Sequence, residues 1–437
     1  MRTWTPPEIP ELPGTGTAPK LFNTATGRLE HPAIPEGRAL LYVCGITPYD
    51  ATHLGHAFTY LAFDIMQRAW RDAGIETVYA QNITDIDDPL LERAHDTGVD
   101  WRDLADGQIG LFRSDMFRLG MIPPDHYVAV TERIDEIAAA VRDLLDRGFA
   151  YRVPTEGAAG EDVYFDVQGA SRDSQWRLGD VAPYDRATML EFSAERGGDP
   201  DRSGKRDPLD PLLWRAAREG EPSWESPVGV GRPGWHVECS VIATEALGGA
   251  FTVQGGGTDL VFPHHEFTAA HATALSGTPL AHAYSHAGLV GYHGHKMSKS
   301  RGNLVFVSKL LNGTHPGQTG GPADPSAIRL GLLAHHYRSE WEWQDADLET
   351  AARRLEAWRT GLERSEAARA RDLAAPDDAP REERASALGV IQQLRAALAN
   401  DLDTPVMLAI LDAAFDRGID QPRLVADAAH ALLGVRL

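Results

Sequence analysis

The chain has 437 residues, 43% of them hydrophobic and 24% charged, and its formal net charge is −21. This is the composition of a globular protein of several domains, and the acidic charge argues against a broad surface for nucleic acid, whose binding needs Lys and Arg against phosphates. No apolar run approaches the roughly 18 residues of a membrane span, and two cysteines cannot form a disulfide framework, so we expect a cytoplasmic monomer without a membrane partner.

The N-terminal part carries the pattern of a parallel sheet. A Pro- and Gly-rich arm over 1–37 is expected to contain one hairpin. The apolar run 39–46 predicts a buried strand, the helical spacing over 52–73 predicts a helix that ends at Gly74, and 77–84 predicts the next strand. Strand, helix, strand is the start of a doubly wound α/β domain.

From about residue 125 to 228 the pattern changes. A predicted helix over 131–147 leads to short strands and to the polar stretch ERGGDPDRSGKRDP (195–208), which together indicate an insertion. The α/β pattern then resumes, with a predicted strand at 251–254 and the stretch GGGTDLVFPHHE (255–266) opening a helix.

Two histidines and a glycine lie where the first strand passes to the first helix, in the stretch THLGHA. Free N–H groups and the helix dipole favour an anion at such a junction, and Gly55 allows a ligand close to the backbone. His53 and His56 add donors that can hold phosphate oxygens. The alternative is that both histidines only cap the helix.

The stretch HKMSKSRGN (295–303) is cationic in a chain that has only five lysines beside 37 arginines. Lys296 and Lys299, with Ser298 and Ser300, would make a compact site for polyphosphate. The alternative is a solvated loop.

Together, HLGH at a strand–helix junction and KMSKS about 240 residues later resemble the class I aminoacyl-tRNA synthetases. The resemblance implies ATP-dependent activation of a carboxylate, with Mg²⁺ accompanying ATP. It also implies that His53, His56, Lys296 and Lys299 stabilise the reacting phosphates, in a reaction that depends on positioning and electrostatics.

The expected fold is therefore α/β, a Rossmann-like catalytic domain with an inserted domain and a C-terminal helical domain. The expected divisions are 1–124 for the arm and the first catalytic half, 125–228 for the inserted connective domain, 229–311 for the second half with the KMSKS loop, 312–350 for a mobile insert and stem-contact segment, and 351–437 for the helical domain.

Candidates for a metal site are Cys44, Cys239, His264, His265 and Glu266. The two cysteines lack zinc-finger spacing, but in a doubly wound fold the strand ends of the two halves converge on one crevice. Two thiolates and one imidazole would leave an open position on Zn²⁺, which a thiolate substrate would fill well.

Five stretches over roughly residues 20 to 350 resemble the cysteinyl-tRNA synthetases: YVCGITPYDATHLGHA, QNITDIDDP, GWHVECS, GGGTDLVFPHHE and KMSKSRGN. The resemblance implies one zinc ion held by Cys44, Cys239 and His264, which selects cysteine over serine. That family's fourth ligand, a glutamate, is replaced here by Thr268, which leaves three protein ligands. His265 is then expected to position a ligand or begin a helix, and Glu266 to be a carboxylate at a helix N-terminus.

ERGGDP (195–200), Thr268 and the short C-terminus are more similar to the mycothiol-pathway cysteine ligases, paralogues of those synthetases. That resemblance implies three small substrates: cysteine, ATP and the amino sugar 1D-myo-inosityl 2-amino-2-deoxy-α-D-glucopyranoside (glucosaminyl-inositol). A true cysteinyl-tRNA synthetase is the alternative, and an inactive paralogue that serves as a binding module is a third.

The same resemblance implies a pocket for the cysteinyl adenylate. Its residues would be Cys44, Gly45, Ile46, Thr47, Thr59, Asn82, Ile83, Thr84, Trp235, Gly257, Thr258, Asp259 and Val290. Asp259 can bind the substrate ammonium or the ribose hydroxyls, and Trp235 would wall the pocket unless it only packs in the core. Asp85, Asp87 and Asp88 are more simply explained as caps of the helix that follows them.

The C-terminal region lacks the features of an RNA-binding surface. Residues 351–437 contain 12 Arg, no Lys and 14 Asp and Glu, and their only aromatic residues are Trp358 and Phe415. Because RNA recognition uses clustered cations and aromatic stacking platforms, we expect no nucleic-acid partner.

Overall fold

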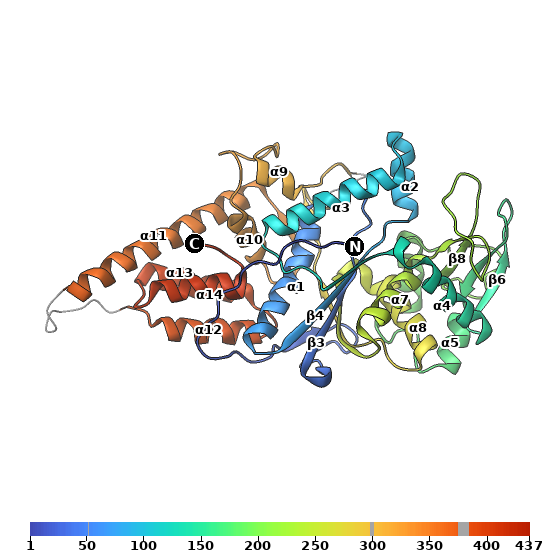
Figure 1. Cartoon of the computed structure of the whole chain (residues 1–437), viewed down its shortest axis with the longest axis horizontal. Coiled ribbons are helices and arrows are strands. Elements are labelled where there is room, and N and C mark those ends of the chain that lie inside the picture. The colour runs from blue at the N-terminus through green and yellow to red at the C-terminus, as the bar shows by residue number, and fades with distance from the viewer. Residues whose placement is uncertain (51, 298–300, 375–383) are drawn as a thin grey trace.

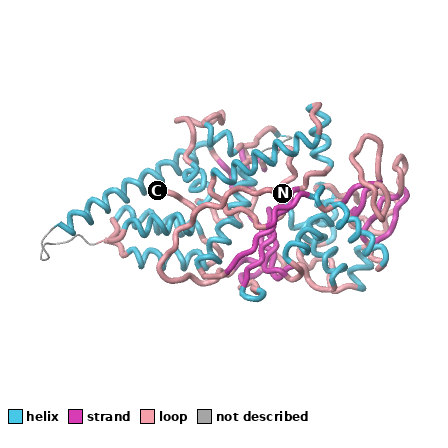
Figure 2. The backbone as a smooth tube through the Cα atoms, in the orientation of Figure 1, coloured by secondary structure: helices cyan, strands magenta, loops and turns pink. Residues whose placement is uncertain are grey.

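The computed structural model describes residues 1–50, 52–297, 301–374 and 384–437. Figure 1 shows three regions side by side, with C-terminal helices at the left, a parallel sheet in the middle and the inserted segment at the right. In Figure 2 the strands of the central sheet run as one bundle between the two outer regions.

The central sheet consists of parallel strands in the order β11–β10–β3–β4–β5. They are β3 (Arg38–Val43), β4 (Glu76–Ile83), β5 (His126–Ala129), β10 (Phe251–Gly257) and β11 (Ala281–Ala287). Of the strands in this sheet, β3 comes first in the chain, and it lies next to β10 from the second half, so strand order reverses between them. This confirms the doubly wound α/β prediction and places the crevice of the fold at the ends of β3 and β10.

Helices cover both faces of this sheet. They are α1 (Leu54–Asp72), α2 (Asp88–Thr97), α3 (Trp101–Arg118), α7 (Trp235–Leu247) and α8 (Glu266–Ser276). Side chains of β3 alternate between two cores: Leu41 and Val43 pack with residues of α1, whereas Tyr42 packs with residues of α7. Because successive side chains of a strand point to opposite faces of the sheet, this alternation places α1 on one face and α7 on the other.

The strand β10, in the second half of the catalytic domain, is longer than the sequence pattern indicated. We expected it over 251–254, with the glycines opening a helix, but β10 continues to Gly257 because Gly255–Gly257 pair with Ser285–Ala287 of β11. The helix α8 begins only at Glu266.

The inserted segment forms its own antiparallel sheet in the order β6–β7–β8–β9. Its elements are α4 (Ile134–Asp146), β6 (Ala150–Pro154), β7 (Glu161–Phe165), α5 (Val167–Asp173), α6 (Arg186–Glu195), β8 (Leu212–Ala216) and β9 (Gly231–Pro233). The domain boundaries stay a prediction, but strand pairing favours a shift of the insertion toward the C-terminus. Residues 126–129 pair within the central sheet, and 231–233 pair with β8.

The C-terminal region is helical, as predicted for 351–437, with α11 (Asp345–Ala374), α12 (Ala387–Ala399), α13 (Thr404–Arg417) and α14 (Pro422–Leu433). A further helix, α10 (Pro325–Leu333), lies within the segment 312–350 that was expected to be a mobile insert and stem-contact segment. None of the helices in the described part of the chain combines the length and apolar character that crossing a bilayer requires. The N-terminal arm contains the predicted hairpin, β1 (Leu21–Asn23) and β2 (Arg28–Glu30). The remaining short elements are β12 (Val290–Tyr292), β13 (His295–Lys296), β14 (Trp341–Trp343), α9 (Val307–Asn312), η1 (Pro35–Gly37), η2 (Val130–Glu132), η3 (Thr258–Leu260) and η4 (Val261–His265).

A buried ion cluster joins the catalytic region to the C-terminal helices. Asp64 of α1 accepts hydrogen bonds from Arg68 (2.8 Å) and from Arg329 of α10 (2.5 Å), and all three residues are 1% exposed. The two guanidinium groups also donate to the carbonyls of Ala431 and Leu433 at the end of α14. The single carboxylate is therefore the shared counter-charge of two buried cations where three helices meet.

Replacing that carboxylate is expected to destabilise the protein strongly. Asp64→Asn leaves two buried guanidinium groups without a counter-charge, and the free energy of unfolding should fall by about 3–5 kcal/mol, the cost typical of breaking a buried pair. Urea denaturation measures this. The control Asp146→Asn breaks an exposed pair with Arg142 on α4 and should change little. Unfolding of Asp64→Asn at the wild-type urea concentration would contradict the role given to the cluster.

Candidate functional site

The loop 44–47 leaves the end of β3 and passes directly over the end of β4. The Gly45 N–H donates to Asn82 Oδ1 (2.8 Å), and the Thr84 N–H donates to the Ile46 carbonyl (3.1 Å). A Cβ at Gly45 would lie 1.6 Å from the Asn82 carbonyl oxygen, so only glycine fits there. Asn82 and Thr84 therefore support the loop from below.

His53 and His56 stand together in the first turn of α1, with ring centroids 3.8 Å apart. His53 caps the helix, because its Nδ1 accepts from the Gly55 N–H (3.1 Å), while His56 Nδ1 is buried without a partner among the described residues. Burial lowers the pKa of His53 well below its usual value and that of His56 to about 4. Both rings are thus neutral near pH 7 and can offer N–H groups to an anion without adding charge.

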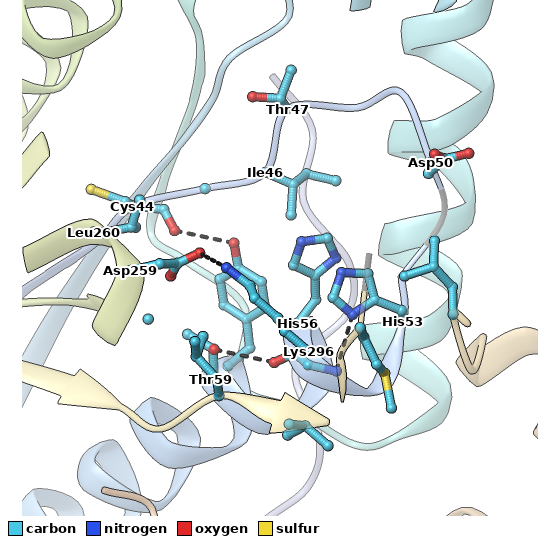
Figure 3. A pocket seen from close by; sticks show the side chains of 18 of the residues that line it. Cys44, Ile46, Thr47, Asp50, His53, His56, Thr59, Asp259, Leu260 and Lys296 are labelled. Carbon is cyan, nitrogen blue, oxygen red and sulfur yellow. Dashed lines mark hydrogen bonds and ion pairs between the residues drawn. The ribbon is translucent and has the colours of Figure 1, made fainter. Parts of the chain in front are cut away.

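Lys296 faces this pair across the site, as Figure 3 shows, and its Nζ lies 2.9 Å from Asp259 Oδ2. Burial would raise the pKa of Asp259, but the charges of Lys296 and Arg196 outweigh it and lower that pKa below its usual value. The carboxylate therefore remains ionised and holds the ammonium at the site. Lys299, the second predicted lysine, lies outside the described residues together with Ser298 and Ser300.

A cavity of about 370 Å³ lies among these groups. The predicted residues that line it are Cys44, Gly45, Ile46, Thr47, His53, His56, Thr59, Trp235, Gly257, Asp259, Val290 and Lys296. The predicted residues Asn82, Ile83, Thr84 and Thr258 do not line it. Since Trp235 does line it, core packing alone does not explain this side chain.

Sequence reasoning missed several lining residues, among them Tyr49, Tyr60, Leu260 and Met297. The Tyr60 hydroxyl donates to the Cys44 carbonyl (3.1 Å) and so fixes the start of the loop. Tyr60 follows His56 by four residues on the same face of α1, which is the one signal that could have identified it.

Cys44, Cys239 and His264 meet at one end of the site, and all three are buried. Their ligand atoms lie within 4.8 Å of one another, with the two Sγ atoms 4.0 Å apart and His264 Nε2 3.3 Å from Cys239 Sγ. Metal–sulfur bonds of about 2.3 Å in a tetrahedral site place two sulfurs about 3.8 Å apart. The donor set therefore fits a tetrahedral metal ion in both ligand type and spacing.

Thr268 is not part of this group. Its hydroxyl donates to the His264 carbonyl (2.7 Å), one turn earlier in the chain, so it is used within the helix. The cluster thus offers three protein ligands and leaves one tetrahedral position for another molecule, the pattern of a catalytic rather than a structural metal site.

Further histidines surround the cluster. His265 Nε2 lies 3.2 Å from Cys44 Sγ, and its Nδ1 lies 2.8 Å from His286 Nε2. His236 Nδ1 lies 3.0 Å from His264 Nδ1. Hydrogen bonds of this kind orient metal ligands, which agrees with the positioning role expected for His265. The sequence did not identify His236 or His286, although His236 precedes Cys239 by three residues on one helix.

Two side chains hold the inserted segment against the site. The buried carboxylate of Glu266, at the start of α8, accepts from Trp176 Nε1 and from three backbone N–H groups of residues 179–182 at 2.7–2.9 Å. Arg196, in the ERGGDP stretch, donates to the carbonyls of Asp259 (2.9 Å) and Phe262 (2.7 Å). The insertion is therefore fixed to the loop that carries Asp259.

The fold and the site define a catalytic domain of the class I synthetase type. Residues 31–353 match the family described as tRNA synthetases class I (C) catalytic domain. Methionyl-tRNA synthetase of Mycobacterium tuberculosis, solved with methionyl-adenylate, has the same fold at 15% identity and a TM-score of 0.63, over 91% of this chain and 92% of that one. A putative arginyl-tRNA synthetase of Campylobacter jejuni gives 0.54 at 13% identity, over 93% and 94%.

Relatives of known name cover the whole chain. A protein of Nakamurella multipartita is 54% identical over 100% of both chains, and one of Clavibacter michiganensis subsp. michiganensis is 53% identical over 100% of this chain and 99% of that protein. Both are named L-cysteine:1D-myo-inositol 2-amino-2-deoxy-alpha-D-glucopyranoside ligase. The chain belongs to this ligase family within the class I synthetases.

Proposed function

We propose that the chain uses ATP to join L-cysteine to the amine of glucosaminyl-inositol, with release of AMP and pyrophosphate. One observation carries the proposal: full-length relatives at 53–54% identity bear the name of this ligase. The thiol- and imidazole-lined end of the site supports it, because a Cys–Cys–His set with one open position suits a sulfur-containing substrate.

In the first step, the cysteine carboxylate attacks the α-phosphorus of ATP, an acyl–phosphate bond forms, and the bond to the β-phosphate breaks. The neutral rings of His53 and His56 would donate to phosphate oxygens, and Lys296 with Lys299 would stabilise charge on the leaving pyrophosphate. The polyphosphate arrives with Mg²⁺. Asp259 would then hold the substrate ammonium or the ribose hydroxyls.

In the second step, the neutral amine of the acceptor attacks the acyl carbon. The amide bond forms as the bond to AMP breaks, and one proton leaves the nitrogen. During both steps Cys44, Cys239 and His264 would hold Zn²⁺, and the bound metal would supply a soft site for the cysteine thiolate. This would favour cysteine over serine, whose hydroxyl stays protonated at neutral pH. Orientation of the two reactants accounts for much of the acceleration in such a step.

The alternative acceptor, tRNA, finds little support in the C-terminal helices. Trp358 and Phe415, the only aromatic residues beyond 350, are 1% and 2% exposed, and they stack on each other with centroids 5.8 Å apart. Neither can receive an unstacked base.

The metal prediction is one tightly bound zinc per chain. Cys239→Ala removes a thiolate ligand and should release the metal and abolish cysteine activation. Thr268→Ala, which loses only a hydroxyl that donates to the backbone carbonyls of His264 and His236, should keep both. Metal analysis of the purified proteins and ATP–pyrophosphate exchange measure these outcomes. Cysteine activation at the wild-type rate in Cys239→Ala would contradict the assignment.

The lysines are expected to act in the first step. Lys299→Ala should slow ATP–pyrophosphate exchange by roughly 10²–10³-fold, the effect of losing one preorganised donor, and Lys296→Ala should act in the same direction. Lys309→Ala, which removes a lysine of α9 outside the cavity lining, is the matched control and should leave exchange unchanged. Normal exchange in Lys299→Ala would show that this loop is not the polyphosphate site.

The acceptor decides between the ligase and the synthetase. The protein is incubated with ATP, cysteine and either glucosaminyl-inositol or tRNA, and the products are identified by mass. We expect the cysteinyl amide with the amino sugar and no cysteinyl-tRNA. Charging of tRNA, together with salt-sensitive tRNA binding at micromolar or tighter concentrations, would restore the synthetase interpretation.

A further inference from the structure

A second cavity, of about 180 Å³, lies between the inserted segment and the catalytic domain, next to the adenylate cavity. Trp235 lines both cavities. On the catalytic side the second cavity is bordered by Asp87 and Asp88 at the start of α2, and on the insertion side by Arg232 of β9 and the turn 197–198. The two cavities therefore share a wall residue and are neighbours in the structure.

Several charged groups of this cavity are already used within the protein. Lys205 Nζ donates to the Asp199 carboxylate and to two carbonyls, and the Asp210 carboxylate accepts from Tyr151, Val167 and Asp207. These groups hold the insertion together. The ammonium of Lys205 and the carboxylate of Asp210 are thus already bonded within the protein, so we do not assign them to a ligand.

Arg232 and Asp87 differ from those groups. Arg232 is 4% exposed. One nitrogen of its guanidinium pairs with Asp88 and, at 3.5 Å, with Glu221, but its Nε is buried without a partner among the described residues. Asp87 accepts the Asp88 N–H through Oδ1 as the cap of α2, and its Oδ2 accepts no hydrogen bond from the described residues. Burial raises the pKa of Asp87 to about 6, so it remains mostly ionised near pH 7.

The donor and acceptor set fits a polyhydroxylated amine. Carboxylates accept from ammonium and hydroxyl groups, a guanidinium donates to hydroxyl oxygens, and an indole offers a flat apolar face. The lining carries four acidic residues (Asp87, Asp88, Asp199 and Asp210) and three basic ones (Lys205, Arg215 and Arg232), a formal charge of −1 from 3 − 4. This balance is unfavourable for the phosphates of a nucleic-acid end.

We propose that this cavity is the acceptor subsite, in which Asp87, Asp88 and Arg232 bind the hydroxyl groups of the amino sugar and leave its neutral amine free to attack. The inference rests on the proposed function. The amine-bearing ring lies against Trp235, because its nitrogen must reach the acyl carbon in the neighbouring cavity. The remaining polyol ring extends toward the turn 197–198, where Gly198 keeps the backbone tight: a Cβ there would meet the Ser193 carbonyl oxygen at 2.6 Å.

The test separates acceptor binding from cysteine activation by using hydroxylamine, a nucleophile too small to need the subsite. Asp88→Asn and Arg232→Lys should raise the KM for glucosaminyl-inositol about ten-fold or more, the loss expected for charge-assisted hydrogen bonds. Cysteinyl hydroxamate formation from ATP, cysteine and hydroxylamine should change less than two-fold in both variants. Asp96→Asn removes an exposed charge from the same helix, away from the cavity, and should leave both reactions unchanged.

Each outcome bears on one of the two proposals. A wild-type KM for the amino sugar in both Asp88→Asn and Arg232→Lys would overturn the subsite and leave the ligase function standing. Wild-type protein that forms the hydroxamate but no amide would overturn the proposed acceptor, and the subsite with it. We expect both variants to fold, because Arg232→Lys retains the charge and the Asp88 side chain is largely exposed. Melting temperatures of the two variants check this.

Discussion

The site depends on one backbone hydrogen bond at the centre of the sheet. The Cys44 N–H donates to the Gly255 carbonyl (3.1 Å), where the first strand of one half meets the first strand of the other. Because strand order reverses at this point, loops from both halves leave the sheet side by side. A cysteine just after β3 can therefore meet a cysteine 195 residues away, and the sulfur-binding end lies beside the phosphate-binding helix end of α1.

Burial then sets the charge of each group around this point. Removed from water, the histidines stay neutral: burial lowers the pKa of His236 and of His286 to about 3. Burial also raises the pKa of Glu266 to about 7, although three backbone N–H groups act against it. One end of the site thus holds neutral histidines and the two cysteines. Among the described residues that line the cavity, Lys296 is the cation.

Local patterns in the sequence predicted β3, α1 and β4, because periodicity is a property of short segments. They left five candidate metal ligands, and the resemblance to the cysteinyl-tRNA synthetases reduced these to Cys44, Cys239 and His264. They could not predict that Arg196 binds the Asp259 carbonyl, 63 residues away, or that His286 supports His265. Such contacts depend on how the insertion packs and on strand register, for which one sequence carries no local signal. The aspartates after β4 illustrate the limit: Asp87 does cap α2, as expected, yet it also borders the second cavity.

The C-terminal helices show why a small acceptor suits this chain. Three of their arginines are bound within the protein: Arg359 pairs with Asp324 (2.8 Å), Arg354 with Asp412 (3.2 Å) and Arg395 with Asp72 of α1 (2.7 Å). A cation engaged in this way fastens helices together and offers less to a phosphate backbone. Arg395 thus joins the C-terminal helices to α1. Arg232 Nε, a buried donor without a partner among the described residues, instead lines the second cavity together with Trp235, and that cavity has the size of a site for a small molecule.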